Sequence, residues 1–277
     1  MTVTTAKITP EVGFEFEGLS GRELVDPERA AECQAALDEH GVVVYREARI
    51  DDEDLAAFSE LLGTVVAPRM GAIDGHPTVT AISLDPAKSE LATYQRSTIF
   101  WHIDGAMDEV PQKATLLTAL VVAEEGGDTE FANTYAAYEA LPEDEKAELD
   151  DVRVVHSFAR AQLHMTPEPS DKERAAWDRV PSKEHPLVWT RRNGRKSFLI
   201  GSTADRVVGL PDQEGRALLD RLLEWSTQPR FVLRHHWHPG DLVIWDNTGL
   251  LHRAIPYEPT SPRLMHRTTL VGEEAVA

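Results

Sequence analysis

The sequence His238-Pro239-Gly240-Asp241-Leu242-Val243-Ile244-Trp245-Asp246-Asn247 joins a turn directly to an apolar run. Pro, Gly and Asp favour reverse turns, so positions 239–241 predict a turn. The four apolar residues 242–245 form a short hydrophobic run next to these turn residues, which is typical of a buried strand. The stretch therefore predicts a buried β-strand that starts at a tight turn.

Other short β-rich segments, separated by turn residues, recur from about residue 76 onward. They lie near residues 77–84, 98–104, 113–123, 152–158, 187–200, 230–236, 241–246 and 263–271. Two helical stretches interrupt them at about 134–149 and 211–226, and Leu218, Leu222 and Trp225 mark one face of the second. Many short strands with few helices favour a β-sandwich or a jelly roll.

The first 75 residues mix helix and strand. Asp26 and Pro27 form a typical helix start, and Gly41 stands where a glycine ends a helix. Residues 41–47 have the β-branched side chains of a strand, and a second helix is expected from about Asp52 to Leu62. Because no repeat or linker-like stretch divides the sequence, we expect a single domain over residues 1–277. In it, a part of about 1–75 packs on a mainly β core of about 76–277.

The composition excludes several classes of function. Asp and Glu number 47 against 28 Lys and Arg, giving a formal net charge of −19, whereas a nucleic-acid partner requires a basic patch. Cys33 is the only cysteine, which excludes an internal disulfide and a cysteine-based zinc site, and we expect it to be buried. No apolar run resembles a signal peptide or a bilayer span, so we expect a cytoplasmic protein without a membrane partner.

The segment Phe100-Trp101-His102-Ile103-Asp104-Gly105 carries an imidazole and a carboxylate two residues apart. On a strand, such side chains project to the same side, so His102 and Asp104 can address one point. The pair supplies two ligands of a 2-His-1-carboxylate triad, the arrangement that leaves open coordination sites on iron(II). His-x-Asp also occurs on protein surfaces, so the interpretation needs a third ligand. His252, in Leu251-His252-Arg253-Ala254, is the candidate.

Two arginines follow this histidine in Pro262-Arg263-Leu264-Met265-His266-Arg267-Thr268-Thr269. On a strand, Arg263, Met265 and Arg267 share one face, and the intervening residues share the other. Unpaired buried charge is costly, so two guanidiniums on one interior face need anions. A dicarboxylate co-substrate would satisfy one of them through a bidentate contact.

Four separated motifs together resemble the taurine dioxygenase and 2,4-dichlorophenoxyacetate dioxygenase family of iron(II)/2-oxoglutarate oxygenases. The motifs are FWHIDG (100–105), GGDTEFANTYAAYEAL (126–141), HPGDLVIWDN (238–247), and LHRA (251–254) with the arginines behind it. The spacing of eleven residues from His252 to Arg263 and of four from Arg263 to Arg267 also agrees with that family. The resemblance covers nearly all of the chain.

The resemblance implies a double-stranded β-helix, a cupin-like jelly roll with flanking and inserted helices. His102, Asp104 and His252 would be the iron ligands and catalytic residues. Arg263 and Thr129 would bind the distal carboxylate of 2-oxoglutarate, and Arg267 would meet an acidic group of the substrate or lie close to the co-substrate. The expected enzyme is a dioxygenase that couples decarboxylation of 2-oxoglutarate to succinate and CO2, with O2, to hydroxylation of a small molecule. Cleavage of a C–O or C–S bond would follow where the hydroxylated carbon bears oxygen or sulfur.

Departures from the taurine enzymes bear on the substrate. The N-terminal loop has Ala67-Pro68-Arg69-Met70 in place of histidine and tyrosine, Thr98 stands in place of an asparagine, and Asn247 is followed by Thr248 where many relatives have arginine. The sulfonate-binding set is thus incomplete, which argues against taurine. We expect a substrate with an anionic group and an apolar body, contacted by Met70, Thr98 and Arg267.

Two other functions remain open. A zinc-dependent hydrolase could use the same three ligands, but it would not require Arg263 and Thr129. A non-catalytic jelly-roll protein could keep the scaffold and bind a metal or ligand without turnover. His235, His236 and His238 precede the turn and are interpreted as structural or exposed. The oligomeric state stays open, with a homodimer and a homotetramer as candidates because both occur in the family that this sequence resembles.

Overall fold

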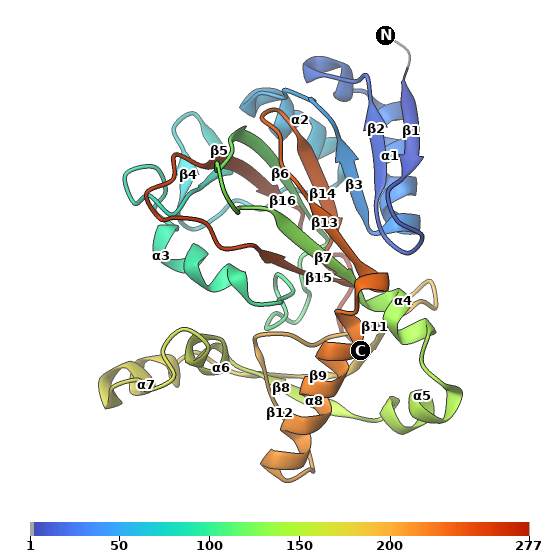
Figure 1. Ribbon diagram of the computed structural model, residues 1–277, viewed down its shortest axis with the longest axis vertical. Coiled ribbons are helices and arrows are strands. Elements are labelled where there is room, and N and C mark those ends of the chain that lie inside the picture. Colours follow the sequence, from blue (N-terminus) through green and yellow to red (C-terminus); the bar gives the residue numbers. More distant parts are fainter. Residues whose placement is uncertain (1–2, 277) are drawn as a thin grey trace.

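The apolar run 242–245 lies inside an eight-stranded sheet in the computed structural model, which describes residues 3–276 and, among them, all side chains but that of Tyr94. The run belongs to strand β14 (Leu242–Asp246), which pairs antiparallel with β3 (Val42–Tyr45) on one edge and with β6 (Ala114–Val121) on the other, so the predicted buried strand is confirmed. The strand order (Figure 1) is β1 (Thr4–Lys7), β2 (Phe14–Glu17), β3 (Val42–Tyr45), β14 (Leu242–Asp246), β6 (Ala114–Val121), β16 (Leu264–Thr269), β5 (His76–Ile82), β4 (Ala72–Ile73).

A smaller antiparallel sheet packs against one face of this sheet. Its order is β13 (Val232–His235), β7 (Thr129–Asn133), β15 (Leu250–Ala254). Val243 and Trp245 of β14 join the apolar core that contains Phe131 of the smaller sheet, whereas Leu242 and Ile244 belong to the core on the other side. Alternate residues of a strand point to opposite faces, so this apolar run stabilises both layers. The two facing sheets form the predicted jelly-roll core.

Helices α1 (Pro27–His40) and α2 (Asp52–Leu62) cover the outer face of the large sheet (Figure 1), and the short helix η1 (Gly21–Leu24) precedes them. The Asp26 carboxylate caps α1 by accepting from the N–H groups of Glu28 and Arg29, and Gly41 ends it with a left-handed φ of 72°. Both predicted helix ends are confirmed. We propose that residues 1–75 form one domain with the core, and we expect a single cooperative unfolding transition.

Between β7 and β13 the chain forms an inserted layer at the end of the molecule away from α1 (Figure 1). The predicted helix 134–149 is two helices, because Pro142 lacks the N–H group that a continuous helix requires. The predicted segment 187–200 is a hairpin, and the predicted helix 211–226 is confirmed. The inserted elements are α4 (Thr134–Glu139), α5 (Glu143–Leu149), β8 (Arg153–His156), α6 (Phe158–Leu163), α7 (Asp171–Trp177), β9 (Lys183–Pro186), β10 (Val188–Thr190), β11 (Lys196–Phe198), β12 (Ala204–Val207), α8 (Asp212–Ser226) and η3 (Pro229–Phe231).

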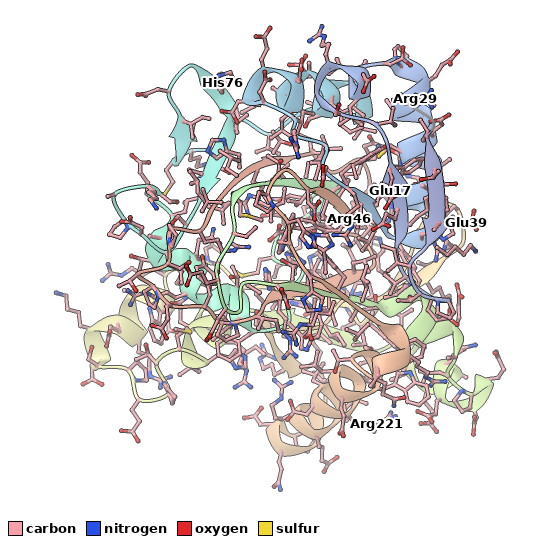
Figure 2. The ribbon with its side chains drawn as sticks, turned by 45° about the horizontal axis from the view of Figure 1, so that its top comes forward. Glu17, Arg29, Glu39, Arg46, His76 and Arg221 are labelled. Atoms are coloured by element: carbon pink, nitrogen blue, oxygen red, sulfur yellow. The ribbon has the colours of Figure 1, made fainter. Side chains whose placement is uncertain are left out.

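Charged side chains are spread over the surface. Figure 2 shows Glu17, Arg29 and Glu39 at the end of the molecule formed by β2 and α1, and Arg221 on α8 at the other end. Cys33 of α1 is fully buried, as predicted, and burial raises the pKa of its thiol to about 12. Within residues 3–276, no helix is long and apolar enough to cross a membrane.

Two neighbouring histidines of the inserted layer are buried as neutral groups. The His156 ring has no exposed surface, its Nδ1 lies 2.9 Å from Thr203 Oγ1, and its ring centre lies 6.0 Å from that of His185. Burial, with a smaller contribution from His185, lowers the pKa of His156 from 6.5 to about 3. Below its unfolded pKa, the unfolded chain therefore binds a proton at this position that the folded chain does not bind.

The free energy of unfolding is consequently expected to fall as the pH falls below 6.5. Above that pH, His156 should contribute no pH dependence to stability. A change from pH 7.5 to pH 5 should lower the free energy of unfolding by about 2 kcal/mol through His156 alone. In His156→Gln, which keeps a polar group for Thr203, this part of the pH dependence should disappear. Urea unfolding of both proteins at the two pH values measures the difference, and an equal pH dependence would contradict the expectation.

Candidate active site

The loop that carries His102 and Asp104 follows two short helices, α3 (Ala92–Gln95) and η2 (Arg96–Ile99). His102 alone pairs: its N–H donates to His252 O of β15 (3.1 Å), and the N–H of His252 donates to His102 O (2.9 Å). Asp104 lies in a turn that Gly105 continues with a φ of 77°, where a Cβ atom would lie 2.9 Å from Gln112 N. The predicted strand 98–104 is therefore wrong, because a helix before it and a glycine turn after it leave a single pairing residue.

The backbone pairing nevertheless brings the three predicted ligands together. His102 Nε2 lies 3.8 Å from Asp104 Oδ1, and His252 Nε2 lies 3.8 Å from Asp104 Oδ2. One ligand atom from each residue lies within 4.8 Å of the others. Two imidazoles and one carboxylate in this arrangement match a facial metal triad with open positions.

The protonation of these groups suits metal binding. His102 Nδ1 lies 2.8 Å from Phe100 O, and because a carbonyl only accepts, Nδ1 carries a proton; the neutral form of the ring therefore has its lone pair on Nε2. Burial is the main cause that lowers the pKa of His252 to about 3; His102 and Arg267 add to it, and Asp104 opposes it. Burial raises the pKa of Asp104, but His252, Arg267 and His102 together outweigh it and lower that pKa. At neutral pH, His252 is therefore neutral and Asp104 is ionised.

Arg263, directly before β16, is a buried cation without a carboxylate partner among the described residues. Its side chain is 4% exposed, and burial lowers its pKa. Nη2 donates to Gly127 O (3.2 Å), and the guanidinium carbon lies 4.9 Å from the centre of the Tyr257 ring. A Cβ atom at position 127 would lie 3.1 Å from Arg263 Nε, so glycine makes room for the guanidinium. A charge held in this way requires an anion, because an uncompensated buried charge is strongly destabilising.

Arg267 and Thr129 complete the polar part of the site. Arg267 Nε is buried and has no hydrogen-bond partner in the described part of the chain, and the charge of Arg267 acts on Asp104 and His252. Thr129, the first residue of β7, is buried, and its Oγ1 accepts a hydrogen bond from Trp237 Nε1 (3.0 Å). Thr129 is thus buried and Arg267 is partly buried with its Nε enclosed, and both side chains line one cavity.

A cavity of about 360 Å³ joins all of these groups. It is lined by the triad and by Thr129, Arg263 and Arg267. The two arginines thus face the same interior space, as their predicted position on one strand face requires. Thr98 also lines it, although its hydroxyl donates to Gln95 O (2.7 Å). Met70 does not: its side chain is 47% exposed and lies outside the cavity wall, so the structure does not bring this predicted contact to the site. The apolar part of the wall includes Ile82, Leu84, Ile99, Leu117 and Met165.

Comparison with known proteins places this geometry in a family. The family model described as "Taurine catabolism dioxygenase TauD, TfdA family" matches residues 4–269. The chain belongs to the TauD/TfdA dioxygenase family. It is 31% identical to the alpha-ketoglutarate-dependent 2,4-dichlorophenoxyacetate dioxygenase of Cupriavidus pinatubonensis, over 100% of both chains. It is also 31% identical to the alpha-ketoglutarate-dependent sulfate ester dioxygenase of Pseudomonas putida, over 97% of this chain and 89% of that one.

A solved structure agrees with this TauD/TfdA membership. The crystal structure of AAD-2 in complex with Mn(II) and N-oxalylglycine has a TM-score of 0.82, with 31% identity and 100% of both chains covered. N-oxalylglycine is an analogue of 2-oxoglutarate. The predicted enzyme class is confirmed: this TauD/TfdA protein is an oxidoreductase, a dioxygenase that uses iron(II), 2-oxoglutarate and O2.

Sequence patterns missed three polar side chains around the TauD/TfdA site. Thr115 Oγ1 donates to Asp104 Oδ2 (3.3 Å), Asn247 Nδ2 donates to Thr115 Oγ1 (2.9 Å), and Trp237 contacts Thr129 as described. Each lies within or beside a segment expected to be a strand, and this position was the only available indication. The interpretation of the three histidines before the turn is confirmed: His235 is buried beside Asp241, and the side chains of His236 and His238 are exposed.

Proposed function

We propose that His102, Asp104 and His252 hold the iron(II) ion of this dioxygenase. The donor set supports this assignment, because two imidazoles and one carboxylate suit a non-haem iron(II) oxygenase. The hydrogen bond from His102 Nδ1 selects the tautomer whose lone pair lies on Nε2, and the Asp104 carboxylate is ionised; a metal requires both. Held on three protein ligands, the ion would keep positions for a chelating co-substrate and for O2.

We propose that Arg263 and Thr129 bind the distal carboxylate of 2-oxoglutarate. The observation that carries the proposal is a buried guanidinium that has no carboxylate partner among the described residues and lines the same cavity as the triad. A carboxylate on Arg263 would form charge-assisted, bidentate hydrogen bonds, and the Thr129 hydroxyl would add a third donor. The reaction of a zinc hydrolase with the same triad does not require a buried cation of this kind, so the presence of Arg263 favours the dioxygenase.

The substrate is proposed to be a small molecule with an anionic group and an apolar body. Arg267 would bind the anionic group, Thr98 would lie beside the substrate, and the apolar wall would pack on its body. Bound iron(II), with 2-oxoglutarate and O2, supplies the oxidising chemistry that inserts one oxygen atom into a substrate C–H bond. Where that carbon also carries an ether or ester oxygen, the hydroxylated product would collapse to a carbonyl compound with cleavage of the C–O bond. The two relatives, whose names specify an aryloxyacetate and sulfate esters, support this class.

Substrate-dependent succinate release tests this proposal. Among aryloxyalkanoic acids, alkyl sulfates and taurine, an aryloxy acid or an alkyl sulfate is expected to raise succinate formation at least about tenfold above the substrate-free rate. Taurine is expected to have little effect. Mass spectrometry should find the phenol or the desulfated carbonyl product in equal amount to succinate. If no anionic substrate stimulates succinate release while a neutral one does, the role proposed for Arg267 is wrong.

The quaternary structure and cellular location stay predictions. We propose a homodimer or a homotetramer with a small-molecule substrate and a cytoplasmic location. Size-exclusion chromatography with light scattering would distinguish the two oligomers from a monomer.

A further inference from the structure

Two threonine hydroxyls at the site each accept a hydrogen bond from a buried side chain that does not itself line the cavity. Thr115 of β6 is fully buried, and its Oγ1 lies 3.3 Å from Asp104 Oδ2 and 2.9 Å from Asn247 Nδ2. Thr129 of β7 is buried, and its Oγ1 lies 3.0 Å from Trp237 Nε1. Asn247 is fully buried and Trp237 is 8% exposed, so water does not compete for either contact.

The direction of the first pair of hydrogen bonds follows from what each group can do. An ionised carboxylate only accepts, so the single hydroxyl proton of Thr115 points to Asp104. The partner on the other side of Thr115 must therefore be a donor, which assigns the Asn247 amide with Nδ2 toward Thr115. The two hydrogen bonds therefore run in one direction: Asn247 donates to Thr115, and Thr115 donates to one oxygen of the Asp104 carboxylate.

The second pair has a direction for a similar reason. An indole N–H only donates, so Trp237 occupies a lone pair of Thr129 Oγ1. The hydroxyl proton of Thr129 is then directed away from the indole, and Thr129 lines the cavity that also contains Arg263. Among the described residues, no group accepts a hydrogen bond from the Thr129 hydroxyl. A carboxylate ligand in the cavity would supply that acceptor.

We propose that Asn247 and Trp237 are positioning residues for two different ligands of the site. Asn247 acts through Thr115 to fix the Asp104 carboxylate, so that the metal meets a carboxylate of defined orientation. Trp237 acts through Thr129 to direct a hydroxyl proton at the distal carboxylate of 2-oxoglutarate. The proposal rests on the proposed function, because it assumes that Asp104 binds the metal and Thr129 the co-substrate. Outer hydrogen-bond partners of this kind orient ligands and tune metal affinity.

Two separate binding measurements distinguish the two roles. Thr115→Val and Asn247→Leu, which keep approximate volume but lose the hydrogen bonds, are expected to weaken Mn(II) binding about tenfold or more in anaerobic calorimetry. Their 2-oxoglutarate affinity at saturating Mn(II) should change less than about threefold. Trp237→Phe should do the opposite: Mn(II) affinity unchanged, and 2-oxoglutarate binding weakened roughly threefold to tenfold.

Matched variants separate positioning from packing. Thr115→Ser keeps the hydroxyl and is expected to retain Mn(II) affinity within about threefold, whereas a purely structural role would make Ser as harmful as Val. Trp189→Phe removes another buried indole, whose N–H has no hydrogen-bond partner among the residues that the structure describes, and it should leave 2-oxoglutarate affinity unchanged. The circular dichroism spectrum of each variant is compared with that of wild-type protein to establish that the variant is folded. If Thr115→Val or Trp237→Phe does not fold, the milder Thr115→Ser and Trp189→Phe variants still allow ligand affinities to be compared with wild type.

The failure of the inference differs from the failure of the proposed function. If wild-type protein binds Mn(II) and 2-oxoglutarate but folded Asn247→Leu and Trp237→Phe bind both as wild type does, the positioning roles are wrong and the proposed function stands. If each variant lowers the affinities for Mn(II) and for 2-oxoglutarate by the same factor, the separation into two roles is wrong. If wild-type protein binds neither ligand, the proposed function itself is overturned, and the positioning roles with it.

Discussion

Replacing Asp104 with alanine is expected to abolish iron(II) binding and succinate formation. Among residues 3–276, the carboxylate of Asp104 is the only acidic group that faces both His102 and His252, and its oxygens lie 3.8 Å from their Nε2 atoms. Loss of an outer partner of a metal ligand already costs about 10- to 100-fold in affinity, so loss of the ligand itself should exceed roughly 100-fold. The remaining two imidazoles, with Arg267 nearby, would present a site without negative charge to a dication.

The measurement is the visible charge-transfer band that iron(II) and 2-oxoglutarate are expected to form together under anaerobic conditions. Wild-type protein should develop the band, and Asp104→Ala should not. Asp108→Ala is the matched control: Asp108 lies in the same loop, its carboxylate is outside the triad, and this variant should keep the band. A band of wild-type intensity in Asp104→Ala would rule out Asp104 as a ligand.

The parts of the fold that were predicted from the sequence depend on local physical chemistry. The turn and buried strand around Gly240 and the capped helix between Asp26 and Gly41 involve neighbours in sequence, so their residue types suffice to predict them. The face shared by Arg263 and Arg267 was likewise predictable, because a strand has a fixed two-residue period. The family motifs added the arrangement of the sheets, which no local pattern contains.

The parts that were not predicted depend on contacts between distant segments. The segment around His102 has the residue types of a strand, but its conformation is decided by one backbone pairing with His252, 150 residues later. The three predicted ligands still converge there, so their proximity was predicted for a reason that was partly wrong. Trp237 and Thr129 are 108 residues apart, and a single hydrogen bond between two side chains leaves no periodic pattern in the sequence. Met70 was predicted because it lies in the loop that corresponds to the histidine- and tyrosine-bearing loop of the taurine enzymes, and loops are where related chains differ most.

Replacing Arg263 with alanine is expected to raise the apparent Kd for 2-oxoglutarate by about 100-fold or more, with metal affinity almost unchanged. Hydrogen bonds to charged groups contribute about 1.5–3 kcal/mol each, and a bidentate contact comprises two of them. The side chain is buried and has no carboxylate partner among residues 3–276, so no ion pair within the protein is lost. Without 2-oxoglutarate, the variant loses the contacts of Arg263 with Gly127 and Tyr257 but also removes an uncompensated buried charge. Because these two effects on stability oppose each other, the variant should unfold at a temperature close to that of wild-type protein.

Thermal unfolding in the presence of metal, with and without 2-oxoglutarate, measures this effect. A ligand that binds only the folded state raises the unfolding temperature, so the co-substrate should stabilise wild-type protein and leave Arg263→Ala unchanged at the same concentration. Arg263→Lys should recover only part of the stabilisation, because an ammonium group cannot form the planar two-point contact. Arg153→Ala, which removes a surface arginine paired with Glu184, should respond to 2-oxoglutarate as wild type does. Equal stabilisation of wild type and Arg263→Ala would place the distal carboxylate elsewhere, and Arg267→Ala would then be the variant to test.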